Sequence, residues 1–170
     1  QLAHALSACG NEVTVIARGA WARTLRTEGL RIHHYVQRKD TVDHLRVLEA
    51  PDGEQYDIVF AVMQYRQMEK ILPDLAQINS PIVVLTGNNL SASEMEARVL
   101  ENSRTPKTVL FGFGSTAGTR ENGRLTTVHT GDGRLTIGKA HEEVPETVKA
   151  VLQQAFSGRL SVVYCDNMDA

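Results

Sequence analysis

A short apolar segment between two glycines places the strongest constraint on how this chain folds. Residues 13–17 are rich in β-branched side chains and lie between Gly10 and Gly19, which predicts a strand buried on both faces, as in a parallel sheet. Residues 1–9 carry apolar side chains at helical spacing, which predicts a helix that Gly10 terminates. A helix, a glycine turn and a buried strand form the second half of a βαβ unit that binds a dinucleotide.

The residue after this strand indicates which dinucleotide is bound. At the tip of the second strand, an acidic residue would bind the 2′-hydroxyl of NAD, but this position holds Arg18. A guanidinium can bind a 2′-phosphate through two hydrogen bonds, so we expect NADP as the cofactor. The alternative is that Arg18 is a solvated charge at a strand end. Arg23 and Arg26, on a helix predicted over 20–28, either assist the phosphate or lie on solvated surface, and we expect the latter.

The overall composition narrows the classes of partner. The chain has 170 residues and a net charge of −2, which gives no general case for a nucleic acid or an anionic membrane as partner. No apolar run reaches the roughly 18 residues that span a bilayer, and we identify no signal peptide. Cys9 and Cys165 lie far apart without CxxC spacing, so neither a disulfide framework nor a zinc site is predicted. We therefore expect a cytoplasmic protein without a metal.

Two further apolar runs predict buried strands at 57–63 and 81–86, each followed by a helix, the first to about residue 76 and the second over 91–101. Such alternation predicts a Rossmann-like α/β fold with a doubly wound, mostly parallel sheet. Ligands bind beyond the carboxyl ends of these strands, so the loops at 64–67 and 87–89 are expected to face the same crevice as Arg18.

Several shorter elements are also predicted, and the two adjacent histidines fall on one of them. His33 and His34 point to opposite faces of a strand, and we expect both to be exposed edge residues rather than metal ligands. Ser91 and Glu94 predict a capping box at the start of the 91–101 helix. The remaining predictions are strands at 30–36, 41–48, 107–113 and 160–164, a hairpin of 127–129 with 135–137 around residues 130–133, and a helix at 144–156.

Both ends of the sequence are expected to be incomplete. A dinucleotide-binding unit needs a first strand and a Gly-rich phosphate loop before its helix, and the sequence begins at Gln1 inside the predicted helix. At the other end, the sequence stops shortly after an expected helix N-cap at Asp166 or Asn167.

Together these segments resemble the N-terminal domain of the ketopantoate reductase family, also called 2-dehydropantoate 2-reductases. The matching segments are 10–18, 57–62, 84–88, 109–112 and 129–138, in the family's order across nearly all of the chain. The resemblance implies an NADP-binding domain over residues 1–170, with a helical C-terminal substrate domain expected after it. It also implies NADPH-dependent reduction of a 2-keto acid to a 2-hydroxy acid in pantothenate biosynthesis, with a lysine of that second domain as the proton donor.

The resemblance assigns roles to five residues. Arg18 matches the arginine that binds the 2′-phosphate, and Gln67 matches a glutamine beside the adenine. Asn88 matches an asparagine near the nicotinamide and the substrate, where an amide can donate to a carbonyl oxygen as negative charge develops, so it is the catalytic candidate. Gln64 stands where the family usually has a lysine near the cofactor phosphate. Met63 either packs or contacts the cofactor, and we include it among the cofactor-binding candidates.

Two departures from the family pattern leave other functions open. A neutral amide at Gln64 loses a charge-assisted contact, and Gly87-Asn88-Asn89 replaces the family's Gln-Asn-Gly. A paralogue acting on another keto acid, a non-catalytic NADP-binding module and an oxidoreductase such as an opine dehydrogenase are therefore the alternatives. A small keto acid is the expected partner, and a homodimer is one candidate assembly.

Overall fold

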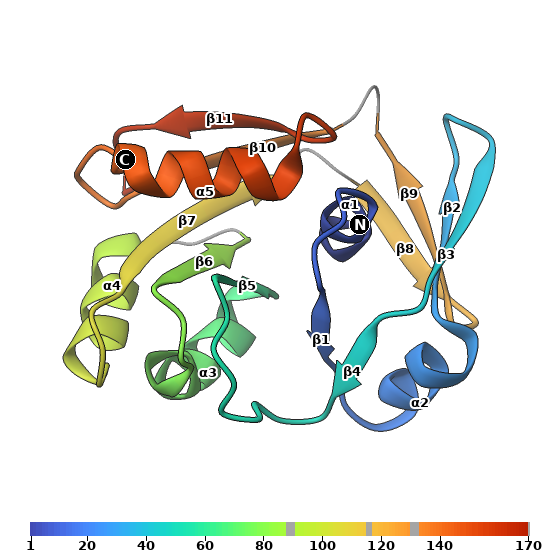
Figure 1. Ribbon diagram of the computed structural model, residues 1–170, viewed down its shortest axis with the longest axis horizontal. Helices are drawn as coiled ribbons and strands as arrows, with labels where there is room; N and C mark the ends of the chain where they lie inside the picture. The colour runs from blue at the N-terminus through green and yellow to red at the C-terminus, as the bar shows by residue number, and fades with distance from the viewer. Residues whose placement is uncertain (88–90, 115–116, 130–132, 170) are drawn as a thin grey trace. The chain divides into compact units, whose positions relative to one another are not determined.

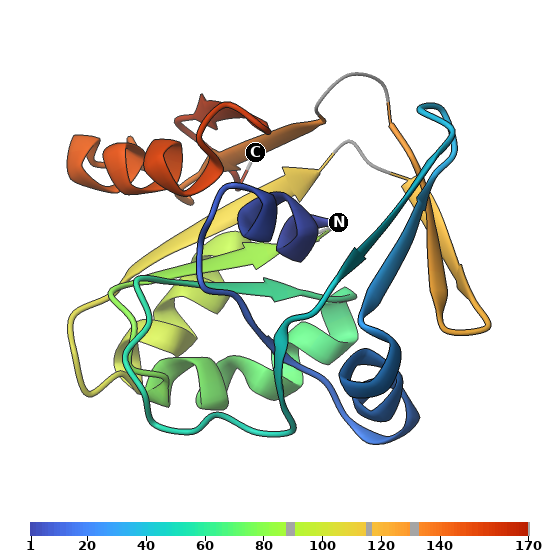
Figure 2. The same cartoon turned by 45° about the vertical axis from the view of Figure 1, so that its right-hand side comes forward.

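The structure is a computed structural model that describes residues 1–87, 91–114, 117–129 and 133–169. The chain divides into two compact units, and each is described by itself (Figures 1 and 2). The first unit comprises Gln1–Asp52, Ser115–Arg134 and Leu152–Ser161, and the second comprises Gly53–Gly114, Leu135–Val151 and Val162–Ala170. The prediction of a single NADP-binding domain over residues 1–170 stays a prediction.

The second unit is built on a five-stranded sheet in the order β11-β10-β7-β6-β5. Strands β5, β6 and β7 are parallel, and β10 is antiparallel to β7. The strands predicted at 57–63, 81–86 and 107–113 are thereby confirmed, and β6 is buried along its whole length, as a parallel strand covered on both faces should be. The strand bounds are β5 (Ile58–Val62), β6 (Ile82–Thr86), β7 (Thr108–Gly114), β10 (Arg134–Gly138) and β11 (Ser161–Cys165).

Two helices bury their apolar faces on this sheet. Helices α3 (Tyr65–Gln77) and α4 (Ala92–Glu101) follow β5 and β6, and both lie on one face of the sheet (Figure 1). Their buried side chains pack into the core together with side chains of β6 and β7. The core therefore fixes the carboxyl ends of β5 and β6, where the predicted loops begin. The principal contacts come from Met68, Leu72, Met95, Val99, Val83, Leu85, Val109 and Phe111.

The first unit contains two smaller sheets. Strands β1 (Thr14–Ile16) and β4 (Arg46–Leu48) form a parallel pair. The other sheet has the order β3-β2-β9-β8, with β2 parallel to β9 and antiparallel to β3. Its strands are β2 (Leu30–His34), β3 (Lys39–Asp43), β8 (Ala117–Glu121) and β9 (Arg124–Val128). Helices α1 (Leu2–Ala8) and α2 (Gly19–Glu28) confirm the two helices predicted there, and Gly29 ends α2 with a positive φ of 74°.

Two sequence predictions about strands in this unit are wrong. The 13–17 strand was expected to be buried on both faces, but Ile16 is 46% exposed and Ala17 is the buried residue. Within the described residues β1 pairs only with β4, so it is not the inner strand of the wide parallel sheet that the prediction assumed. The predicted 41–48 strand is also two strands, β3 and β4, which belong to different sheets.

The predicted hairpin of 127–129 with 135–137 is also wrong, because β9 and β10 lie in different sheets. The hairpin joins β8 to β9, and its turn is Asn122-Gly123 with φ values of 48° and 72°. A type I′ turn requires positive φ at both central residues, and Asn-Gly is its preferred sequence.

The last helix, α5 (Glu146–Phe156), confirms the helix predicted at 144–156. Among the helices of the described residues, none combines the length and apolar character that a membrane span requires.

Candidate functional site

Arg18 lies where two parallel strands of the first unit end side by side. Ala17 donates its N–H to the carbonyl of Leu48 at 2.9 Å, so the chain leaves β1 beside the end of β4. Arg18 is the N-cap residue of α2, is exposed, and donates Nε–H to the carbonyl of Glu49 at 3.2 Å. This bond orients the guanidinium and leaves its two terminal nitrogens without a carboxylate partner in the described residues.

A neighbouring arginine pairs with the carboxylate of Glu49. Arg26 donates to the Glu49 carboxylate at 2.9 Å, and this hydrogen bond is the main reason why the pKa of Glu49 is lowered. The charge of Arg26, the N–H of Gly19 and the charge of Arg23 act in the same direction. Arg26 is therefore paired with Glu49, whereas both terminal NH2 groups of Arg18 can donate to an anion, and the residues present fit a phosphate group.

Met63, Gln64 and Gln67 lie in the second unit, where β5 leads into α3. Met63 packs against the core, and Gln64 is the N-cap residue of α3, whose carbonyl accepts from the N–H of Gln67 at 2.9 Å. Both glutamine side chains are exposed. Gln64 makes no capping hydrogen bond through its side chain, so both amide groups face solvent beyond the carboxyl end of β5.

The segment that contains Asn88 begins next to Met63. Gly87 has φ 145°, and a Cβ on it would lie 2.7 Å from the carbonyl oxygen of Met63, a separation that only glycine permits. The Gly87 N–H is also bonded to the carbonyl of Gly112 at 3.1 Å. Asn88 and Asn89 lie outside the described residues. Within the second unit, the structure thus brings Met63, Gln64, Gln67 and Gly87 to one edge of the sheet.

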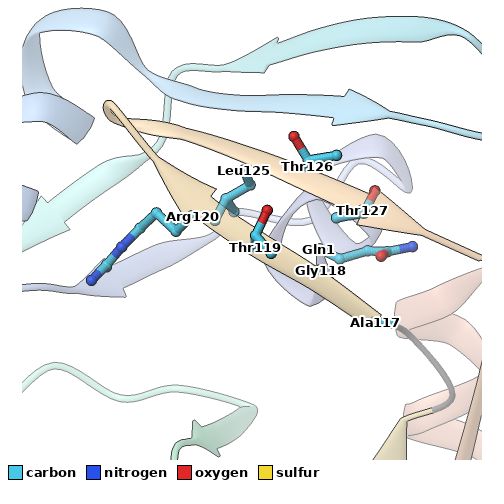
Figure 3. A pocket seen from close by; sticks show the side chains of 8 residues that line it. All are labelled: Gln1, Ala117, Gly118, Thr119, Arg120, Leu125, Thr126 and Thr127. Atoms are coloured by element: carbon cyan, nitrogen blue, oxygen red, sulfur yellow. The ribbon is translucent and has the colours of Figure 1, made fainter.

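The first unit contains a pocket of about 250 Å³ that the sequence analysis missed (Figure 3). It opens beside Gln1, against the paired strands β8 and β9. Thr127 is 5% exposed, and its hydroxyl has no hydrogen-bond partner. The sequence signal for this pocket is the Asn122-Gly123 turn. It predicts a hairpin that pairs residues 117–121 with 124–128, the two strands that line the pocket. The lining residues are Gln1, Ala117, Gly118, Thr119, Arg120, Leu125, Thr126 and Thr127.

The prediction that His34 is an exposed edge residue is wrong. His34 is 7% exposed, its Nε2 lies 2.9 Å from the Thr41 hydroxyl, and its ring is 5.2 Å from that of His4 and 5.9 Å from that of His129. Burial, followed by the charges of the neighbouring groups, lowers the pKa of His34. The side chain is inside because β2 is covered by α1 on this face, where His4 also contacts Asp43 at 2.8 Å. In the described part of the chain, no group of three metal-ligating side chains is arranged to hold an ion.

Solved structures with the same fold match nearly the whole chain. The 2-dehydropantoate 2-reductase from Methylococcus capsulatus has a TM-score of 0.77 and 21% identity, with coverage of 99% of this chain and 54% of that chain. The 2-dehydropantoate 2-reductase from Geobacter metallireducens GS-15 has a TM-score of 0.77 and 15% identity, with coverage of 97% and 54%. A D-mandelate dehydrogenase solved with NADH and anilino(oxo)acetate has a TM-score of 0.72 and 19% identity, with coverage of 98% and 53%.

At these identities, the likeness establishes the Rossmann-like α/β fold. The chain spans about half of the length of these solved chains. Among curated proteins, none matches this sequence.

The family is established by sequence. The profile described as ketopantoate reductase PanE/ApbA matches residues 1–142, which is most of the chain. The resemblance to this family is thereby confirmed, and the chain belongs to the ketopantoate reductase PanE/ApbA family.

Proposed function

We propose that this chain is the nucleotide-binding part of an NADPH-dependent reductase that converts a 2-keto acid, ketopantoate or a close analogue, to a 2-hydroxy acid. The observation that supports this proposal most is the position of Arg18. It lies at the end of β1, and its two terminal guanidinium nitrogens are not paired with any carboxylate of the described residues. Family membership supports the reaction class. A helical substrate domain that follows this chain, and supplies the proton-donating lysine, is part of the same proposal.

The proposal gives each candidate residue a role. Arg18 binds the 2′-phosphate, and Met63, Gln64 and Gln67 line the part of the cofactor site beyond β5. When bound, NADPH supplies the hydride that reduces the carbonyl carbon. Asn88 donates its amide N–H to the substrate carbonyl oxygen, which stabilises that oxygen as it becomes negative.

NADH is a second candidate for the cofactor, because of Glu49. This carboxylate lies at the end of the strand next to Arg18 and would repel a 2′-phosphate or accept from a ribose hydroxyl. A D-mandelate dehydrogenase of the same fold was solved with NADH. We favour NADPH because the Glu49 carboxylate is already paired with Arg26, which reduces that repulsion.

The reaction is tested with the full-length protein, by following NADPH oxidation with a series of 2-keto acids that includes ketopantoate. We expect turnover with at least one of them. Asn88→Ala is expected to lower kcat by about 100-fold, the usual effect of removing one such donor, with the Kd for NADPH changed less than twofold. NADPH binding without turnover of any keto acid would favour the non-catalytic module instead, and unchanged kcat in Asn88→Ala would remove Asn88 from the mechanism.

The proposal has three further parts. They are a role in pantothenate biosynthesis, which rests on the family, a cytoplasmic location, which rests on the composition of the sequence, and assembly as a homodimer. Sedimentation of the full-length protein tests the last, because a homodimer doubles the mass of the sedimenting species.

A further inference from the structure

Glu49, the residue that follows β4, is bonded to two arginines of the α2 region at once. Its backbone carbonyl accepts from Arg18 Nε at 3.2 Å, and its carboxylate accepts from Arg26 Nη1 at 2.9 Å. Arg18 is the N-cap residue of α2, and Arg26 lies in the last turn of the same helix. One acidic residue therefore contacts both the side chain that is proposed to bind the 2′-phosphate and a second guanidinium.

The Glu49 carboxylate carries a full negative charge beside the start of α2. The hydrogen bond and the charge of Arg26, followed by the N–H of Gly19, lower the pKa of this carboxyl group. Gly19 comes directly after Arg18, and the unpaired N–H groups of a helix start favour anions. The Glu49 side chain is 54% exposed, so a phosphate group bound by Arg18 would face this charge.

Arg26 offsets the charge from a fixed position. Its Nη2 donates to the Val47 carbonyl at 3.4 Å while its Nη1 donates to the Glu49 carboxylate, and α2 packs beside β4 (Figure 1). The guanidinium is thereby bonded to two residues of the segment that ends β4. Without Arg26, Glu49 would present an unpaired carboxylate, the kind of group that accepts from a ribose hydroxyl of NAD and repels a 2′-phosphate.

We propose that Arg26 determines cofactor specificity, because its pairing with Glu49 cancels the negative charge that would oppose a 2′-phosphate at Arg18. This inference rests on the proposed function, since it takes Arg18 as the residue that binds that phosphate. Arg26 acts through Glu49 and not by touching the cofactor, so it is a positioning residue. NADH carries no 2′-phosphate, so loss of Arg26 shifts the preference of the protein toward NADH.

The test measures the Kd for NADPH and for NADH by titration of the full-length protein and three variants. Arg26→Gln should weaken NADPH binding about tenfold, because a full negative charge then faces the phosphate, and NADH binding should stay within about twofold. Glu49→Gln keeps the backbone carbonyl that Arg18 contacts, and it should bind NADPH at least as tightly as the unaltered protein does.

The double variant separates an effect through Glu49 from any other effect of losing Arg26. If the carboxylate causes the loss, Arg26→Gln combined with Glu49→Gln should return the Kd for NADPH to within about twofold of that of Glu49→Gln alone. Arg23→Gln is the matched control, since Arg23 is an exposed arginine of the same helix and its charge has the smallest effect on the pKa of Glu49. It should leave both affinities within about twofold.

Three results would overturn the inference: unchanged NADPH binding in Arg26→Gln, an equal loss for NADPH and NADH, or a loss that Glu49→Gln does not rescue. The equal loss would show a structural role for the ion pair, and the unrescued loss a direct contact of Arg26 with the phosphate. The proposed function fails separately, if Arg18→Gln does not weaken NADPH binding. When Arg18→Gln weakens NADPH selectively and Arg26→Gln does not, only the role of Arg26 is lost.

Discussion

Replacing Gly138 by alanine tests how closely residues 165–168 pack against the end of β10. A Cβ at this position would lie 2.3 Å from the Cys165 carbonyl oxygen and 2.6 Å from Met168 Cγ, so residues 165–168 must move away by about 1 Å to reach ordinary contact distances. The strand itself cannot yield, because β10 pairs with β7 through Gly138 and Phe111. The backbone of Gly138 is not in the left-handed region, so the substitution adds a steric clash without backbone strain.

The expected cost follows from these contacts. Overpacking of a tightly packed site typically costs about 1–3 kcal/mol, and loss of the bonds from the Met168 N–H to the Lys139 and Ala140 carbonyls adds about 0.5–1.5 kcal/mol. We therefore expect the free energy of unfolding to fall by about 2–4 kcal/mol, and amide exchange at Met168 to become faster.

Urea unfolding followed by circular dichroism measures the loss, and Gly114→Ala is the matched control. Gly114 ends the neighbouring strand β7, and a Cβ there meets no atom within 4 Å, so its replacement should change the unfolding free energy by less than about 1 kcal/mol. Equal stability of the two variants would refute the close approach of residues 165–168 to β10.

Two further predictions concern the first unit. The lowered pKa of His34 means that the folded protein binds fewer protons than the unfolded chain below about pH 6.5, so the unfolding free energy should fall as the pH drops through that range. His34→Gln should flatten this dependence in urea titrations at pH 7.5 and 5.0, whereas the exposed His44→Gln should not, and a slope that survives in His34→Gln would contradict the assignment. Gly123→Ala forces a side chain into a turn with φ 72° and places its Cβ 3.0 Å from Thr24. It should cost about 1–2 kcal/mol, and an unfolding midpoint equal to that of the unaltered protein would argue against the Asn122-Gly123 turn.

The positions of most helices and strands could be predicted, because they depend on local patterns. The apolar run at 82–86 is a strand buried along its whole length, and the glycine after residue 28 ends a helix as expected. In each case neighbouring residues supply the signal, through periodicity or a glycine with positive φ.

Pairing between distant segments could not be predicted in the same way. The hairpin was placed at 130–133 because glycines stand there, although Asn122-Gly123 carries the stronger turn signal. His34 was expected outside because β2 alone does not reveal that α1 covers its inner face.

The site shows the same division between local and distant signals. The place of Arg18 at a strand end follows from the local pattern, whereas the pairing of Arg26 with Glu49 joins residues 23 positions apart. The carboxylate of Asp169 accepts from the N–H and the hydroxyl of Ser93 in the first turn of α4, where Ser91 makes no capping hydrogen bond through its side chain. Asp169 lies 76 residues after Ser93, so no short sequence motif could predict this contact.

The affinities for NADPH and NADH, measured by titration of the full-length protein and its Arg18→Gln variant, test most directly whether Arg18 binds the 2′-phosphate. Charge-assisted hydrogen bonds contribute about 1.5–3 kcal/mol, so we predict that the variant binds NADPH at least about tenfold more weakly, while its Kd for NADH changes less than twofold. Arg23→Gln, an exposed arginine of the same helix, should leave both affinities nearly unchanged. An equal loss for the two cofactors in Arg18→Gln, or no loss for either, would contradict the account.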